Sequence, residues 1–197
     1  MMTHSHLLDK CILNLLPIDL DNLVILDVGC GYGEWGALLR RRKGSFYLVG
    51  VDIWRPHLTM LNRIGVYDEL IQVDAPKLPF KDKSVDISLA CEVLEHLGKE
   101  EGYELLKDLE RISRNMVIVS TPLNWPQENI YSNPYERHRS EWTPSEFSNI
   151  GYKVKTIDVA INPPRRLGFL NTIAVFLLRR SSRKLIVAYR RSKNIEH

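Results

Sequence analysis

Apolar residues in this chain gather into short runs, and segments with helical spacing lie between these runs. Short runs rich in Val, Ile and Leu predict buried strands, whereas apolar residues that recur every three or four positions predict helices with one buried face. The sequence therefore predicts strands and helices in alternation. Strands are expected over residues 24–28, 46–51, 68–73, 84–90, 115–120, 152–161 and 185–189.

Five helices are expected. One follows residues 29–33, where Trp35, Leu38 and Leu39 fall at helical spacing, and one begins near Pro56. Three more are indicated by their pattern or by their end signals. An apolar stripe near the start predicts a leading helix within residues 1–20. Residues 99–112 carry Tyr and Leu at helical spacing among charges, which predicts an amphipathic helix. Thr143 and Glu146 form a capping box, so a further helix begins there, and Gly151 is expected to end it.

The segment on which the rest of the chain depends follows the first strand. The strand ends with Asp27 and Val28, and Gly29, Gly31 and Gly33 follow at alternate positions. Glycine lets the backbone turn with positive φ and lets a ligand lie directly against the main chain. In an open α/β sheet, this turn is where a nucleotide-like ligand binds.

A glycine motif can be aligned with this turn in two ways, starting at Gly31 or at Gly29. Gly31 to Gly36 fits G-x-G-x-x-G, the dinucleotide fingerprint, and would indicate a nicotinamide-dependent oxidoreductase. In the frame that starts at Gly29, the third glycine position is Glu34 instead. Because Glu34 and Asp27 add negative charge where a pyrophosphate would bind, the turn favours a cationic or zwitterionic ligand.

Residues 26–33, Leu-Asp-Val-Gly-Cys-Gly-Tyr-Gly, resemble motif I of the class I S-adenosylmethionine-dependent methyltransferases. The resemblance implies a Rossmann-like, doubly wound α/β sheet of seven strands, mostly parallel, with the last strand antiparallel and helices on both faces. It implies S-adenosylmethionine as the cofactor. Gly29, Gly31 and Gly33 would then cradle its methionine end, with Asp27 beneath.

Two acidic residues at strand ends complete the expected cofactor site. Asp52 lies about twenty positions after the glycine turn, where a carboxylate binds ribose hydroxyls; the alternative is that it caps the next helix. Ile53 and Trp54 would flank the adenine. By resemblance, Asp74 binds the adenine amino group and Ala75 allows close approach; the alternative is a plain loop Asp.

The segment after the fourth strand, residues 91–97, also resembles the family and faces the point of methyl transfer. The resemblance places Cys91 and Glu92 beside the cofactor, with Glu92 holding the methionine portion or a substrate. Glu95 is expected to be structural. His96 has the near-neutral pKa of a general base; alternatively it only bonds the backbone, because positioning alone can supply most of the rate of a methyl transfer.

A long connection, residues 121–142, is rich in aromatic residues, Pro and charge. Connections of this length are usually functional or disordered, and the aromatics argue against disorder. In similar methyltransferases this loop covers the active site and helps to select the substrate. His138 is therefore a second candidate catalytic residue, and the alternative is that it tethers the loop.

Charge is distributed unevenly along the chain. The formal net charge is +3, yet residues 163–197 hold nine Lys or Arg and only Glu196 as an acid. Within this basic segment, residues 167–178 are apolar and flanked by arginines. They form either a core element or an interfacial element, so that residues 165–184 would contact anionic lipid. The arginines could also contact RNA, but no known nucleic-acid module supports this.

The remaining composition restricts the class of protein. The length is that of one domain, expected over residues 1–197. Three cysteines without a C-x-x-C pair argue against disulfides or a zinc site, and His4 and His6 are expected to be solvated, so no metal is expected. The absence of a leader sequence and of a long apolar stretch favours a cytoplasmic location.

The sequence therefore predicts a methyltransferase that uses S-adenosylmethionine and acts on a small-molecule acceptor, with nucleic acid as a less favoured partner. The alternative is a non-catalytic scaffold that binds an anionic partner, lipid or RNA, through the basic segment. The acceptor atom and the oligomeric state stay open.

Overall fold

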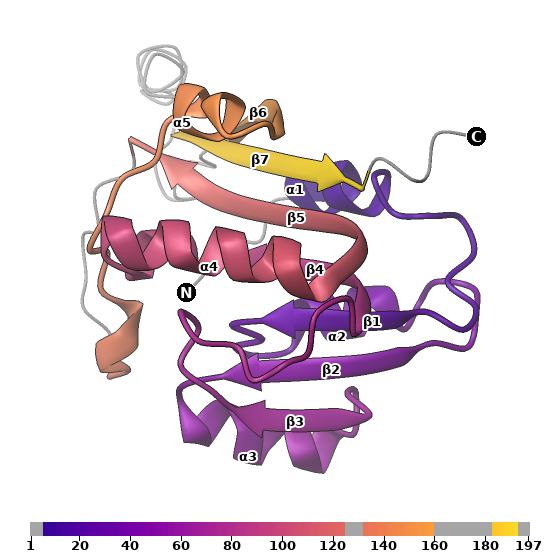
Figure 1. The fold of residues 1–197 in the computed structure, drawn as a ribbon. Coiled ribbons are helices and arrows are strands. Elements are labelled where there is room, and N and C mark those ends of the chain that lie inside the picture. The colour runs from indigo at the N-terminus through magenta and orange to yellow at the C-terminus, as the bar shows by residue number, and fades with distance from the viewer. Residues whose placement is uncertain (1–5, 125–131, 160–182, 193–197) are drawn as a thin grey trace, which may run out of the picture.

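The computed structural model describes residues 6–124, 132–159 and 183–192, which form a seven-stranded sheet with helices on both faces (Figure 1). The strand order is β3-β2-β1-β4-β5-β7-β6. The strands are β1 (Val24–Val28), β2 (Tyr47–Asp52), β3 (Glu69–Gln72), β4 (Val85–Cys91), β5 (Ser113–Leu123), β6 (Lys153–Val159) and β7 (Arg183–Arg191). The first five are parallel, and β7 is antiparallel to both β5 and β6. The predicted Rossmann-like α/β sheet is confirmed.

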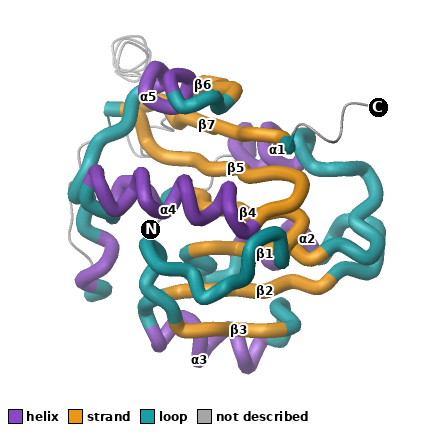
Figure 2. The backbone as a smooth tube through the Cα atoms, viewed as in Figure 1, coloured by secondary structure: helices purple, strands orange, loops and turns teal. Residues whose placement is uncertain are grey.

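Helices cover both faces because successive residues of a strand point to opposite sides of the sheet. Ile25 and Leu26 of β1 accordingly belong to two different buried clusters. The helices that pack on one cluster are α1 (His6–Leu13), α2 (Glu34–Leu39) and α3 (Arg55–Ile64); those on the other are α4 (Lys99–Ile112) and α5 (Pro144–Asn149). In Figure 2, α4 lies across the near face of the sheet.

The order of the strands reverses next to β1, which pairs with β2 on one side and with β4 on the other. In open α/β sheets the ligand crevice opens at this reversal, outside the carboxyl ends of the strands. Two short 3₁₀ helices follow: η1 (Leu94–His96), directly after β4, and η2 (Pro134–Glu136), within the long connection.

Several element bounds differ from the prediction. β5 extends to Leu123 because Thr121, Pro122 and Leu123 all pair with β7. α1 ends at Leu13, and residues 14–16 form a turn rather than the last turn of the predicted helix. The apolar, arginine-flanked segment 167–178 lies outside the described residues. Among the helices that are described, none is both long and apolar enough to cross a membrane.

Candidate functional site

The glycine turn adopts the conformation that its sequence predicts. Gly29, Gly31 and Gly33 have φ angles of 68°, 51° and 82°. A Cβ added at Gly29 would lie 2.5 Å from Val93 Cγ2, and one at Gly33 would lie 2.4 Å from Leu61 Cδ2. A Cβ at Gly31 would meet only the Gly29 carbonyl oxygen, at 3.8 Å. Gly29 and Gly33 are thus required by packing, whereas at Gly31 no side chain covers the backbone.

A cleft of about 300 Å³ opens beside this turn, at the carboxyl ends of the central strands. It is long enough along the sheet to reach from the glycine turn to the 133–139 segment of the long connection. Most of the predicted site residues line it: Gly29, Gly31, Asp52, Ile53, Asp74, Ala75, Glu92 and His96. The other four do not line it: Asp27 and Cys91 are buried, Gly33 is the N-cap of α2, and His138 lies beside His96.

Asp52 ends β2 and is nearly buried. Its carboxylate accepts hydrogen bonds from the backbone N–H of Gly31 (2.8 Å) and of Trp54 (2.7 Å), and it lies 3.3 Å from His57 Nδ1. Trp54 is the N-cap of α3, so its bond to Asp52 agrees with the alternative that Asp52 stabilises the start of the next helix. The bond to Gly31 ties the carboxylate to the glycine turn, so Asp52 and the turn form one structural unit.

Asp27 lies fully buried at the end of β1. Its Oδ2 accepts a hydrogen bond of 2.6 Å from the Tyr67 hydroxyl, whereas Oδ1 has no partner among the described residues. Burial raises the pKa of Asp27 to about 7, against the lowering effect of the Tyr67 hydrogen bond and with a further increase from Asp52. A carboxyl with this pKa is only partly ionised at neutral pH, and a positively charged ligand near the glycine turn would favour its ionised form.

Glu92 follows β4 directly and lines the cleft with a φ of 57°, which is uncommon for a residue other than glycine. Its backbone N–H donates to the Ser120 carbonyl (2.9 Å), and its Oε1 accepts from the Ser120 hydroxyl (2.8 Å). These two contacts to β5 hold the unusual conformation. Strained residues of this kind are concentrated at ligand sites.

Glu95 and Cys91 are buried behind the cleft wall. Glu95 accepts a hydrogen bond of 3.1 Å from Thr121 Oγ1, and burial together with the nearby Glu92 holds its pKa well above the usual range. Burial, with Asp27 and Glu92, likewise raises the pKa of the Cys91 thiol. A protonated, buried thiol is a packing group rather than a nucleophile.

His96 and His138 come together although 42 positions separate them. Their ring centroids are 5.1 Å apart, and the rings meet edge to face. Burial, with the nearby His138, lowers the pKa of His96 to about 4. At neutral pH this ring is uncharged, and it is much less basic than the near-neutral pKa expected for a general base.

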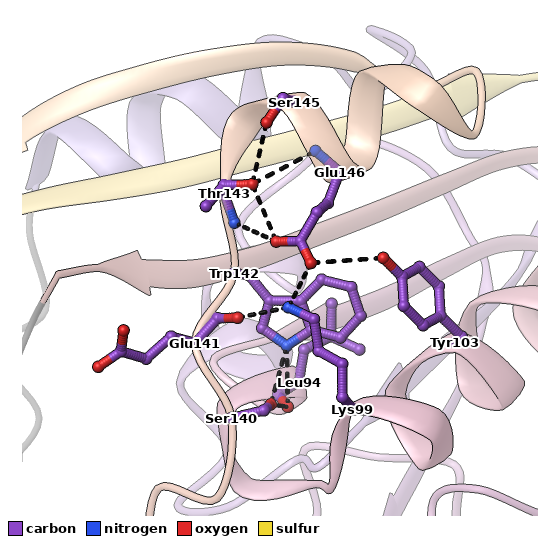
Figure 3. A network of polar contacts seen from close by, with 9 residues as sticks. All are labelled: Leu94, Lys99, Tyr103, Ser140, Glu141, Trp142, Thr143, Ser145 and Glu146. Carbon is purple, nitrogen blue, oxygen red and sulfur yellow. Dashed lines mark hydrogen bonds and ion pairs between the residues drawn. The ribbon is translucent and has the colours of Figure 1, made fainter.

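The end of the long connection is fixed to η1, as Figure 3 shows in part. The backbone N–H groups of Arg139 and Ser140 donate to the Glu95 carbonyl, at 2.7 and 3.1 Å. The Ser140 hydroxyl and Trp142 Nε1 donate to the Leu94 carbonyl, at 3.0 and 3.3 Å. The two residues that follow His138, together with Trp142, thus tether this part of the connection to η1.

Lys99 and Glu146 close the same network. Lys99 Nζ lies 2.7 Å from Glu146 Oε1 and 3.9 Å from the centre of the Trp142 ring (Figure 3). Glu146 also accepts from the backbone N–H of Thr143, which confirms the predicted capping box. The network fixes the indole of Trp142 against α4.

Several residues at the site were missed by sequence reasoning. Tyr67 and His57 contact the two key carboxylates, and Tyr135 packs 6.0 Å from Trp54 at the cleft. His57 carried a usable signal, because it lies in the first turn of the helix that follows Asp52. Tyr67 carried none, because nothing in its local pattern relates it to Asp27.

Residues 26–119 match the family model described as a methyltransferase domain. Two curated relatives also match. An uncharacterized protein of Methanocaldococcus jannaschii is 27% identical over 137 residues, which are 68% of this chain and 56% of that protein. The tRNA (carboxymethyluridine(34)-5-O)-methyltransferase of Arabidopsis thaliana is 34% identical over 77 residues, 39% of this chain and 18% of that protein. The chain thus spans only part of the length of both relatives.

Solved structures share the fold. One is a chain from the Haloferax volcanii complex of the Trm112 methyltransferase activator with a methyltransferase, with a TM-score of 0.66 and 20% identity, covering 91% of this chain and 86% of that one. Others, 15% to 19% identical, are described as S-adenosylmethionine-dependent methyltransferases. At such identities the likeness establishes the fold, and with the domain match it supports S-adenosylmethionine as the cofactor.

Proposed function

We propose, from the class I S-adenosylmethionine-dependent methyltransferase fold of this chain, that it binds S-adenosylmethionine in the cleft and transfers its methyl group to an acceptor. The observation that carries the proposal is the bond between the Asp52 carboxylate and the Gly31 backbone N–H. This bond joins Asp52, the residue that we propose to bind the ribose, to the glycine turn, and both line the cleft.

The residues of the cleft have separate roles in this proposal. A carboxylate can accept about four hydrogen bonds, so Asp52 can receive ribose hydroxyls besides the Gly31 and Trp54 N–H groups. Asp74 and Ala75 line the far end of the cleft, for the adenine, with Ile53 beside it. S-adenosylmethionine, when bound, supplies an activated methyl group on a positively charged sulfur.

The acidic end of the cleft suits that positive charge. Glu92 lines it, and Asp27 lies buried near the glycine turn with one unmatched oxygen. Oppositely charged groups attract more strongly where water is excluded. These carboxylates therefore favour a sulfonium ligand and disfavour the pyrophosphate of a dinucleotide.

His96 and His138 mark the acceptor side of the cleft. The pKa of about 4 leaves His96 a neutral ring that binds and orients an acceptor rather than a strong base. Orientation of two reactants can by itself supply a large part of a rate enhancement. We therefore assign the two histidines to acceptor positioning, with the connection 133–139 selecting the acceptor.

A small molecule is the acceptor that we favour, because the sequence carries no known nucleic-acid module. An RNA nucleoside is the second candidate, since one relative is a tRNA methyltransferase and Arg137 and Arg139 line the cleft. A Trm112-like activator is a candidate protein partner by analogy with the Haloferax complex. The cytoplasmic location and the scaffold alternative that uses residues 163–197 stay predictions.

Calorimetric titration with S-adenosylhomocysteine, S-adenosylmethionine and NAD tests the cofactor. We expect the two sulfur ligands to bind and NAD not to bind. Asp52→Asn should weaken binding about 10- to 100-fold, because a hydrogen bond to a charged group contributes about 1.5–3 kcal/mol. Asp158→Asn, an exposed Asp on β6, is the matched control and should bind normally. A folded protein that binds neither sulfur ligand contradicts the proposal.

Methyl transfer to cell fractions then tests the acceptor. The full chain is incubated with S-adenosylmethionine labelled in the methyl group, together with either a small-molecule extract or purified tRNA. Label in the small-molecule fraction supports the favoured acceptor, whereas label in tRNA that is lost after nuclease treatment selects the RNA candidate. Label in neither fraction, from a protein that binds the cofactor, favours the scaffold alternative.

A further inference from the structure

Glu95, His96 and His138 bring three metal-ligating side chains to one place on the acceptor side of the cleft. One donor atom from each side chain lies within 4.8 Å of the other two. All three residues belong to the part of the chain that the structure describes. Glu95 is buried and the two histidines are half-buried, so the cluster is sheltered without being closed. It is separate from Asp52 and Asp74, to which the cofactor was assigned.

Backbone structure and hydrogen bonds hold the three residues of this cluster in place. Glu95 and His96 share the single turn of η1, which begins just after β4. His138 is positioned by its neighbours, because the N–H groups of Arg139 and Ser140 both donate to the Glu95 carbonyl. Two distant segments are therefore joined at the residue that contributes the carboxylate. A rigid frame of this kind is what a metal site requires.

The His96 ring of the cluster is not fully hydrogen-bonded by the described residues. Nδ1 of His96 is buried and makes no hydrogen bond of good geometry with the described residues, although the backbone of Arg137 and Glu136 lies close to the ring. His96 Nε2 lies 3.9 Å from Glu95 Oε1, too far for a hydrogen bond. Buried polar atoms are normally paired, and an exception calls for an explanation such as an ion. A second carboxylate, Glu92, lies close enough to affect Glu95 electrostatically.

The donor set indicates which ion fits. Two imidazoles and one carboxylate with an open position are the ligands of catalytic zinc sites, and imidazole suits transition metals in general. Mg²⁺ instead prefers oxygen ligands in octahedral geometry. Ligands about 2.1 Å from a tetrahedral ion are about 3.4 Å apart. The donor atoms, now within 4.8 Å, would have to converge by up to about 1.4 Å, which side-chain rotation can provide.

We propose that Glu95, His96 and His138 bind a divalent transition-metal ion of the Zn²⁺ or Co²⁺ type, with an open position toward the cleft that His96 lines. An oxygen or nitrogen of the acceptor is the chemical group that would complete the coordination. The site stands on the cluster itself and does not depend on the identity of the acceptor or on methyl transfer.

Titration with Co²⁺ tests the site directly, because bound Co²⁺ with nitrogen ligands gives visible absorption that differs from that of the aqueous ion. The full-length chain, free of an affinity tag and treated with a chelator, should bind one Co²⁺. Zn²⁺ should abolish the absorption by displacement, and Mg²⁺ at the same concentration should leave it unchanged. His138→Ala should weaken Co²⁺ binding at least tenfold.

Two further variants make the outcome decisive. The double variant His4→Ala/His6→Ala removes N-terminal histidines outside the cluster and should bind Co²⁺ like the parent. Glu95→Gln keeps an oxygen acceptor for Thr121 and should weaken binding even if His138→Ala unfolds. Thermal unfolding confirms that each variant is folded. The proposal is overturned if the parent shows only the aqueous spectrum, or if folded Glu95→Gln and His138→Ala bind as tightly as the parent.

Discussion

The Tyr67 hydroxyl donates a hydrogen bond of 2.6 Å to the Asp27 carboxylate, although 40 positions separate the two residues. Both groups are buried, and the other oxygen of Asp27 has no partner among the described residues. One neutral hydrogen-bond donor does not compensate for the loss of water around a charged carboxylate. The pKa of Asp27 accordingly rises to about 7. A group with this pKa makes the stability of the protein depend on pH.

The contribution of Asp27 to the free energy of unfolding should fall as the pH rises from about 4 to about 7, whereas the lowered pKa of His96 acts in the opposite direction. The folded state raises the pKa of Asp27 from 3.8 to about 7, so in this window the folded protein binds a proton that the unfolded chain has lost. Between pH 5 and pH 8 the loss from this group is on the order of 2–3 kcal/mol. Urea unfolding of the parent and of Asp27→Asn at the two pH values measures it. The variant should lose less stability, and equal losses would contradict the assignment to Asp27.

Tyr67→Phe should destabilise the protein, and more at pH 8 than at pH 5. The ring would still pack, but Asp27 would lose the hydrogen bond from the Tyr67 hydroxyl, and its charged form would have no donor among the described side chains. An unsatisfied buried group costs about 1–3 kcal/mol. Urea unfolding at both pH values gives the difference. Tyr47→Phe, an exposed tyrosine at the start of β2, is the control and should change little at either pH.

The grouping in one cleft of the residues that we propose for the cofactor could be predicted because their signals are local. Each strand ends with a residue whose type indicates a ligand contact, and the carboxyl ends of parallel strands meet at one edge of the sheet. Asp52, Asp74 and the glycine turn were therefore found one strand at a time, and most of them line one cleft. The fold followed from the same alternation and from the resemblance to methyltransferases.

The acceptor side could be predicted only in part, because it depends on contacts between distant segments. His96 and His138 were each singled out, but their contact requires Arg139 and Ser140 to bond to Glu95. The low pKa of His96 arises from burial, which its residue type does not reveal. The full length of β5 likewise depends on pairing with β7, far away in the sequence.

Gly31→Ala and Gly33→Ala should separate ligand binding from packing. Both positions have positive φ, so each Ala costs about 1–2 kcal/mol of stability. At Gly31 the new methyl group meets no side chain within 4 Å, so the main effect should be at least tenfold weaker binding of S-adenosylhomocysteine. At Gly33 the methyl group would overlap Leu61 Cδ2, so the stability should fall further. Calorimetry and urea unfolding of both variants provide the comparison. Equal stability losses, or normal binding by Gly31→Ala, would contradict this division.

Trp142→Phe should loosen the segment that carries His138. The indole is buried, donates to the Leu94 carbonyl, and lies beneath the Lys99 ammonium group. Phe fills most of the volume but cannot donate, so we expect a loss of about 1–3 kcal/mol and more frequent local opening. Arg137 and Arg139 are exposed in this segment, so trypsin should cleave there several-fold faster in the variant. Trp35→Phe, a buried tryptophan of α2 in the other hydrophobic cluster, is the matched control. An unchanged cleavage rate in Trp142→Phe would show that the indole does not hold the segment.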